Sequence, residues 1–378
     1  MVVDEDALVP FALIDLRDVH RLGTVSGFNL VIEARWHNAS PERLELSGGD
    51  LLPGPASPAD NTSSRAAALR AFLLDALHDF PSDHYLLILW GHAYGFGFGR
   101  DADRIAFPEL ASVLNDFSRQ RADRKLEILA CNACRIGKVE TAYELRHVVK
   151  YLVASQVGVP FEGWPLREVL GDLVKSPAIA PPDFASTMVT RFCDSYRRRT
   201  VTMTMLDLEG SGLVLASLER LANALLAEGD HSTEGLRSTH EAFVRAANDY
   251  EETEPVVDLL EVCSRLREAS ADAAVRTAAA DVIETLSTSG FIAKHDGVGP
   301  GAERLHGIGL YVPHVGLDVN SNIYAKLGLV HARMWARVVD ALKVSNKYAQ
   351  VVEAIDVLER ETLRKCKNVP STQVGESV

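Results

Sequence analysis

The segment "YLLILWGHAYGFGFGRD", residues 85–101, decides the fold because it joins an apolar run to a histidine and a glycine series. Residues 85–90 are all apolar, which is typical of a strand buried on both faces of a parallel sheet. His92 follows almost at once, and glycines stand at positions 91, 95, 97 and 99. Their spacing is not G-x-G-x-x-G, so a dinucleotide-binding loop is not expected.

A second apolar run ends in reactive residues. In "KLEILACNACRIGKVE", residues 125–140, the strand-like stretch 126–130 leads into Cys131 and Cys134. Open parallel sheets place their sites at the carboxyl ends of the strands, so His92 and Cys134 are expected to meet although 42 positions separate them. A Cys–His pair of this kind lets the imidazole take the thiol proton while backbone N–H groups hold an oxyanion.

The two cysteines permit other interpretations. A thioredoxin-like redox couple is one, but its usual setting early in a small βαβ domain is absent. Half of a zinc site is another, but Cys193, Cys263 and Cys366 stand alone and supply no second pair. We expect Cys131 to be a small buried hydrophobe and Cys134 to be an exposed, stabilised thiolate where the strand gives way to a loop.

The rest of the first half alternates between strand and helix patterns. The expected strands are 9–16, 28–34, 85–90, 126–130 and 151–155, and the expected helices are 66–77, the region around 110–117, and 139–149, with a loop at 53–64. Such alternation predicts an α/β fold with a mostly parallel central sheet flanked by helices.

The pattern changes after residue 200. Residues 206–286 are rich in Ala and Leu at helical spacing, 307–313 ("GIGLYVP") is a late strand, and 323–342 is helical. We therefore expect a core at 1–205, a mainly helical region at 206–367 whose late strand joins the core, and a disordered tail at 368–378.

Composition limits the classes of function. The 378 residues are 47% hydrophobic and carry a formal charge of −13, which favours neither nucleic-acid nor membrane binding. Five cysteines in so long a chain are not a disulfide framework. The first residues lack the pattern of a signal peptide, and no apolar run is long enough to span a bilayer, so a cytoplasmic location is expected.

Three stretches in order resemble the clostripain family of cysteine peptidases, which shares a clan with caspases, metacaspases, gingipains, legumain and separase. They are "LILWGHAYGFGFGRD", "ACRIGKVETAYELRHVVKYLVASQ" and "EGWPL". The resemblance covers about residues 65–225, and the late "GIGLYVP" also fits. It implies a caspase-like fold, with a helical carboxyl-terminal extension here, and proteins or peptides as substrates.

The resemblance also implies roles for single residues. His92 corresponds to the family's catalytic histidine and Cys134 to its nucleophile, while Cys131 has no family role. The backbone N–H groups of Ala93 and Cys134 are expected to hold the oxyanion. Ala93 departs from the glycine usual in the family and tolerates fewer backbone angles.

A pocket for an arginine or lysine at P1, the substrate residue before the scissile bond, is implied at Asn132, Glu162 and Trp164. The family commonly has Asp where this chain has Asn132, so one of two carboxylates is lost. Glu162, before Gly163 and Trp164, keeps the other. The amino-terminal region is shorter and more divergent than usual, so a first strand is expected to be missing or altered.

Three hypotheses remain open. The first is an active endopeptidase, which the presence of both His92 and Cys134 favours. The second is an inactive caspase-like scaffold or binding protein, and the third is a thiol oxidoreductase using Cys131 and Cys134. No cofactor or metal is expected: calcium occurs in parts of the family, but the acids in "RDADR" and "LDLEG" are too few and wrongly spaced for a calcium loop.

Finally, we expect a latent enzyme activated by a cut after a basic residue, made by itself or by an activating protease. Such a form suits an intracellular bacterial pathway of proteolysis or defence. The candidate sites are Arg100 and Arg104 after the glycine series, and Arg119, Arg121, Arg124 and Lys125 before the strand that carries the cysteines. A cut at either place leaves two pieces held by one sheet.

Overall fold

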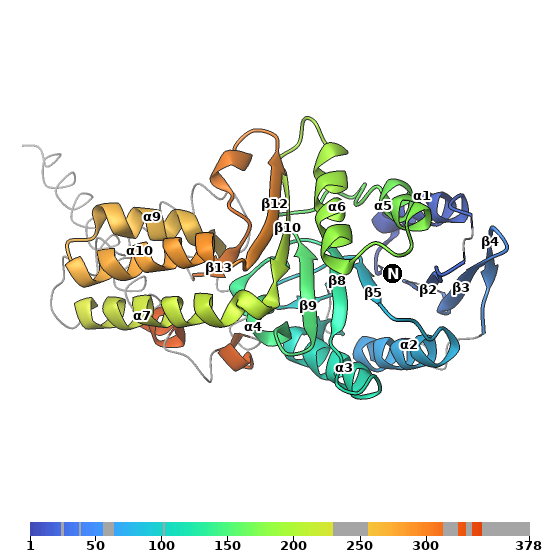
Figure 1. Cartoon of the computed structure of the whole chain (residues 1–378), viewed down its shortest axis with the longest axis horizontal. Helices are drawn as coiled ribbons and strands as arrows, with labels where there is room; N and C mark the ends of the chain where they lie inside the picture. The colour runs from blue at the N-terminus through green and yellow to red at the C-terminus, as the bar shows by residue number, and fades with distance from the viewer. Residues whose placement is uncertain are drawn as a thin grey trace, which may run out of the picture.

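The computed structural model describes residues 1–23, 26–37, 39–55, 64–100, 103–229, 256–312, 324–329 and 335–341. The expected tail at 368–378 and part of the expected helix 323–342 lie outside these residues. A five-stranded sheet forms the centre, in the order β12-β10-β9-β8-β5 (Figure 1). Its strands are β5 (Leu86–Trp90), β8 (Leu126–Asn132), β9 (Val149–Ala154), β10 (Val201–Asp207) and β12 (Ile292–Val298).

Most of this sheet runs in one direction. β5, β8 and β9 are parallel neighbours, whereas β10 is antiparallel to both β9 and β12. Four of the five strands therefore point the same way, and the expected α/β architecture with a mostly parallel sheet is confirmed. Residue 205, where we placed the end of the core, lies inside β10.

Helices cover both faces of the sheet (Figure 1). One face carries α2 (Arg65–Asp79), α3 (Phe107–Arg119), α4 (Val139–Leu145) and α7 (Ser211–Gly229), and the other carries α5 (Leu166–Lys175) and α6 (Pro181–Asp194). Strand β8 serves both layers because its side chains alternate: Leu129 and Cys131 enter the first core, Ile128 and Ala130 the second. The apolar run at this strand reflects burial on two sides.

The prediction of a strand at 9–16 is wrong, because Val9–His20 forms the helix α1. Pro10 lies in its first turn, where a missing N–H costs nothing, and the buried Ala12, Asp15 and Val19 recur at helical spacing. A separate four-stranded sheet lies beside it, made of β1 (Val2–Val3), β2 (Val31–Trp36), β3 (Glu42–Ser47) and β4 (Asp50–Pro53). Only β2 overlaps an expected strand.

The second half contains strands that composition hides. β12, "IAKHDGV", is a polar strand at the edge of the sheet. Because its apolar and polar residues do not alternate regularly, the sequence does not predict a strand there. The late strand β13 (Gly309–Tyr311) pairs with β11 (Val256–Asp258), and Gly309 also bridges to Lys138 of the core. Helices α9 (Leu259–Ala269) and α10 (Ala273–Thr288) lie beside α7 at one end of the molecule (Figure 1). No helix in the described ranges is long and apolar enough to cross a membrane.

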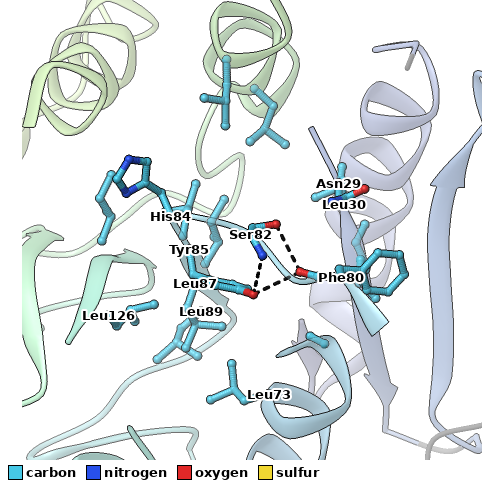
Figure 2. Close-up of a pocket in the computed structure, with 18 of the residues that line it drawn as sticks. Asn29, Leu30, Leu73, Phe80, Ser82, His84, Tyr85, Leu87, Leu89 and Leu126 are labelled. Carbon is cyan, nitrogen blue, oxygen red and sulfur yellow. Dashed lines mark hydrogen bonds between the residues drawn. The ribbon is translucent and has the colours of Figure 1, made fainter. Parts of the chain in front are cut away.

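A cavity of about 980 Å³ lies between β5 and the amino-terminal sheet. Its wall is mainly apolar, with Leu30 just before β2, Leu73 from α2, and Leu87 and Leu89 from β5 (Figure 2). At one end the Ser82 N–H donates to the Tyr85 hydroxyl, which donates in turn to the Phe80 carbonyl (Figure 2). Neither His92 nor Cys134 lines this cavity, so the chemistry must be sought at the sheet edge.

Candidate active site

The pairing of β5 with β8 brings His92 and Cys134 to one edge of the sheet. Trp90 lies opposite Asn132, and the Gly91 N–H donates to the Asn132 carbonyl at 3.2 Å. His92 lies two residues after Trp90, and Cys134 lies two residues after Asn132. The two side chains therefore leave neighbouring parallel strands at the same carboxyl-terminal edge.

Cys134 and Cys131 differ in their surroundings. Cys134 is partly exposed, and its Sγ lies 3.3 Å from the Val159 backbone N–H, which donates to it, and 3.6 Å from the Val159 carbonyl. Cys131 is completely buried, and burial raises the pKa of its thiol far above the usual range. Only Cys134 is therefore placed to act as a nucleophile.

The loop after His92 is a tight hairpin. The Tyr94 N–H donates to the Gly97 carbonyl at 3.2 Å, and the Gly99 N–H donates to the His92 carbonyl at 2.7 Å. These bonds flank the bridge between Ala93 and Phe98 and do not use the Ala93 N–H. The Ala93 N–H, which was expected from the family resemblance to hold the oxyanion, therefore takes no part in these two bonds.

A buried lysine ties this hairpin to the segment that follows Cys134. Lys138 is 1% exposed, and its Nζ donates to the Gly95 carbonyl at 2.7 Å and lies 5.3 Å from the centre of the Phe96 ring. Lys138 was not among the residues expected at the site, because a lysine is almost never fully buried. Its location joins the two loops that carry His92 and Cys134.

Two acidic residues of the amino-terminal segment face His92. Glu5 Oε1 lies 2.9 Å from His92 Nε2, and Asp4 Oδ1 lies 3.9 Å from the same nitrogen. The hydrogen bond with His92, together with the nearby Arg100 guanidinium, lowers the pKa of Glu5. Sequence reasoning missed both acids, since nothing local connects residues 4–5 with position 92.

The expected P1 residues lie near one another but in different environments. Glu162 is about half exposed and pairs with Arg199 at 2.7 Å. Asn132 is buried, and a Cβ on Gly163, whose φ is +62°, would come within 2.7 Å of its Nδ2. Trp164 is 1% exposed and packs against Phe192 in the core, so it supports the loop from beneath.

The candidate processing residues also differ. Arg121 is 9% exposed, and its guanidinium binds Glu127 at 2.8 Å and stacks on Tyr85 at 4.6 Å. Arg119 ends α3, Arg124 donates to the Asp83 carbonyl, and Lys125 donates to the Arg146 carbonyl. Arg100, by contrast, is mostly exposed and pairs with Glu5, and Arg104 follows in the same loop.

Metal-binding side chains do not cluster in the described part of the chain: no three His, Cys, Asp or Glu residues there are arranged to hold an ion.

Comparisons with known proteins identify the family and the fold of the chain. A family model described as the clostripain family matches residues 2–307. No curated protein matches the chain. Among solved structures, the chain is similar to an inactive zymogen C11 protease from Parabacteroides distasonis, at 15% identity and a TM-score of 0.65, covering 87% of this chain and 96% of that one.

It is also similar to a secreted C11 cysteine protease from Bacteroides thetaiotaomicron in complex with an irreversible peptide inhibitor. The identity is 14%, the TM-score is 0.63, and the alignment covers 89% of this chain and 98% of the other. These similarities show that the expected caspase-like fold is right.

Proposed function

Because the chain belongs to the clostripain family of cysteine peptidases, we propose that it cleaves peptide bonds after arginine or lysine through Cys134 and His92. The observation that carries the proposal is the paired register of β5 and β8, which sets a partly exposed thiol and an imidazole on adjacent strand ends. A thiolate next to an imidazole is the arrangement that acyl transfer requires.

The reaction follows from these positions. Cys134 transfers its proton to His92, and the thiolate attacks the peptide carbonyl carbon. The backbone N–H groups of Ala93 and Cys134 hold the oxyanion while the C–N bond breaks and His92 protonates the leaving amine. Water, activated by His92, then hydrolyses the thioester.

The preference for a basic P1 residue rests on Glu162. Its carboxylate already holds the guanidinium of Arg199 at 2.7 Å, the same group that an arginine substrate would present. Charge-assisted pairs of this kind are stronger than neutral hydrogen bonds. Asn132, buried beside Gly163, supplies an amide rather than a second charge.

We also propose that the chain is made as a latent enzyme that a cut activates. The chain resembles a protease described as an inactive zymogen, and its loop at Arg100 and Arg104 offers basic residues between the two catalytic strands. A cut there, by the enzyme itself or by an activating protease, leaves β5 and β8 paired in the sheet.

The test is hydrolysis of a fluorogenic peptide with Arg at P1. Cys134→Ala and His92→Ala should each abolish nearly all activity, since nucleophile and base act as one unit. Cys131→Ala, a change of the same type three positions earlier, should keep the chemistry. Activity of Cys134→Ala close to wild type would refute the assignment, and loss in Cys131→Ala alone, without unfolding, would favour a redox function.

A further inference from the structure

The amino-terminal segment contributes two carboxylates to the imidazole of His92. We propose that Glu5, backed by Asp4, positions His92 and stabilises its protonated form, so that the site is a Cys–His–carboxylate triad whose third member comes from the start of the chain. The inference rests on the dyad proposed above. Glu5 acts through His92 and is therefore a positioning residue.

The first support is the geometry of the ring. His92 Nε2 lies 2.9 Å from Glu5 Oε1, so Nε2 donates and the carboxylate accepts. A neutral imidazole has one N–H donor and one acceptor, and a donating Nε2 leaves Nδ1 as the acceptor. In the proposed dyad, Nδ1 is then the atom that takes the proton from Cys134, and the carboxylate compensates the positive charge that appears on the ring.

The second support is the rigid attachment of the segment. Val3 is fully buried, the Met1 amino group donates to the Glu33 carbonyl at 2.8 Å, and Val2 pairs in register with Arg35 of β2. Gly91, with φ +143°, lets this strand approach, because a Cβ there would lie 2.5 Å from the Val2 carbonyl oxygen. The residue before the histidine is thus shaped to admit the segment that carries the acids.

The third support is the charge balance around the two acids. Arg100, on the loop after His92, pairs with Glu5, and Arg65 of α2 lies 3.8 Å from Asp4. The Asp4 side chain is 4% exposed and neither of its oxygens has a hydrogen-bond partner within the described residues, although the ring of His92 is 3.9 Å away. A buried carboxylate without a hydrogen bond calls for an explanation, and an imidazolium at His92 offers one.

Phe161 completes the surroundings of the ring, edge-on with its centroid 6.2 Å from that of His92. It carries no charge. Among the described residues, the charged groups that surround the ring are Glu5 and Asp4 from the amino-terminal segment, with Arg100 and Arg65 behind them.

The test compares Glu5→Gln and Glu5→Ala with Asp6→Asn, which removes the same charge from an exposed neighbour. Gln keeps an oxygen that can accept from Nε2 but loses the charge. We expect a drop in kcat of about 10-fold or more for Glu5→Gln, with a larger drop for Glu5→Ala and none for Asp6→Asn. The basic limb of the kcat/KM profile should move down by about one pH unit in Glu5→Gln, because the imidazolium loses its partner.

Two readouts do not depend on hydrolysis. The pH at which iodoacetamide alkylates Cys134 should rise in Glu5→Gln, since a weaker imidazolium stabilises the thiolate less. In the Cys134→Ala background, the pKa of His92 measured by NMR should fall when Glu5 becomes Gln. Thermal unfolding of each variant identifies any that is merely misfolded.

Unchanged kcat, pH profile and histidine titration in a folded Glu5→Gln would overturn the triad while leaving the dyad intact. A rise in kcat would also overturn it, because it would show that Glu5 restrains the imidazole. Failure of the dyad itself is recognised separately, by activity that survives Cys134→Ala.

Discussion

Glu162 and Arg199 form an exposed pair within the region where a P1 side chain is proposed to bind, with side chains 52% and 58% exposed. Arg199 shows that the carboxylate accepts a guanidinium. In the proposed pocket, Arg199 would compete with a basic substrate side chain for this carboxylate. Exposed pairs contribute about 0–1 kcal/mol, so a substrate can displace Arg199 at little cost.

This competition predicts opposite effects of two substitutions. Glu162→Gln should lower kcat/KM for Arg peptides more than for neutral ones, and Arg199→Gln should raise it by freeing the carboxylate. Asn132→Asp should strengthen the preference for basic residues by adding a second charge. The measurement is kcat/KM for matched peptides with Arg, Lys and Leu at P1, and equal changes for all three would place the pocket elsewhere.

Asp15 is a buried carboxylate whose Oδ2 accepts from Trp90 Nε1 at 2.6 Å. Burial raises its pKa to about 7. A carboxyl group whose pKa is raised on folding contributes stability below its unfolded value, near 4, and that contribution disappears as the pH rises through 7.

Asp15→Asn should therefore be relatively more stable at high pH. The amide oxygen still accepts from Trp90 but has no charge to desolvate. We expect the difference in unfolding free energy, variant minus wild type, to grow by on the order of 2 kcal/mol between pH 5 and pH 8.5. Urea unfolding at both values measures it. Glu140, which is also buried with a pKa of about 7, is present in both proteins, so its contribution cancels in the difference between their unfolding free energies. A difference that does not depend on pH would contradict the prediction.

At the scale of elements, the active site depends on two loops that leave adjacent strands and are fastened to each other. Lys138 binds the His92 hairpin through the Gly95 carbonyl, and Gly309 of β13 donates to the Gly137 carbonyl at 2.8 Å. Glu140 in α4 accepts from the Tyr311 N–H of β13. The late strand thus stabilises the segment that follows Cys134 from behind.

Lys138→Met should loosen the hairpin without altering any catalytic group. Loss of a buried charged hydrogen bond costs about 1.5–3 kcal/mol. We expect lower stability, a reduced kcat and faster amide hydrogen exchange across residues 93–99. Lys175→Met is the matched control, because that lysine is 79% exposed. Unchanged amide hydrogen exchange across residues 93–99 would show that the hairpin is stable without the contact from Lys138.

At the scale of the whole molecule, every candidate processing site lies in the sequence between β5 and β8. Five paired positions, from Leu86 with Ile128 to Trp90 with Asn132, hold these strands together. The exposed loop at Arg100 and the buried guanidinium of Arg121 favour cleavage in the first segment, since a protease needs an extended, accessible chain.

Activation should therefore yield fragments whose new amino terminus lies just after Arg100 or Arg104. The fragments should co-elute in native size-exclusion chromatography and separate on a denaturing gel. Arg104→Gln should reduce cleavage there, whereas Arg119→Gln should not. Cys134→Ala distinguishes self-cleavage from cleavage by an added protease. A wild type that remains intact while fully active, with and without a candidate activator, would rule the idea out.

The sequence alone determined the central strands and the residues at their ends. Apolar runs at 85–90 and 126–130 indicate strands buried on both faces, and a parallel sheet places whatever follows such runs at one edge. The common edge of His92 and Cys134 and the burial of Cys131 could be inferred in this way, because each depends on local composition and one topological rule.

Tertiary structure alone decided what surrounds those two residues. Glu5 reaches His92 across 87 positions, and Lys138 reaches Gly95 across 43. The polar edge strand β12 and the helix α1, whose first residues look like a strand, were also settled only by their partners in the fold. Composition records whether a side chain is buried, but a contact between distant segments depends on how the backbone closes the loops between them, and no local pattern encodes that.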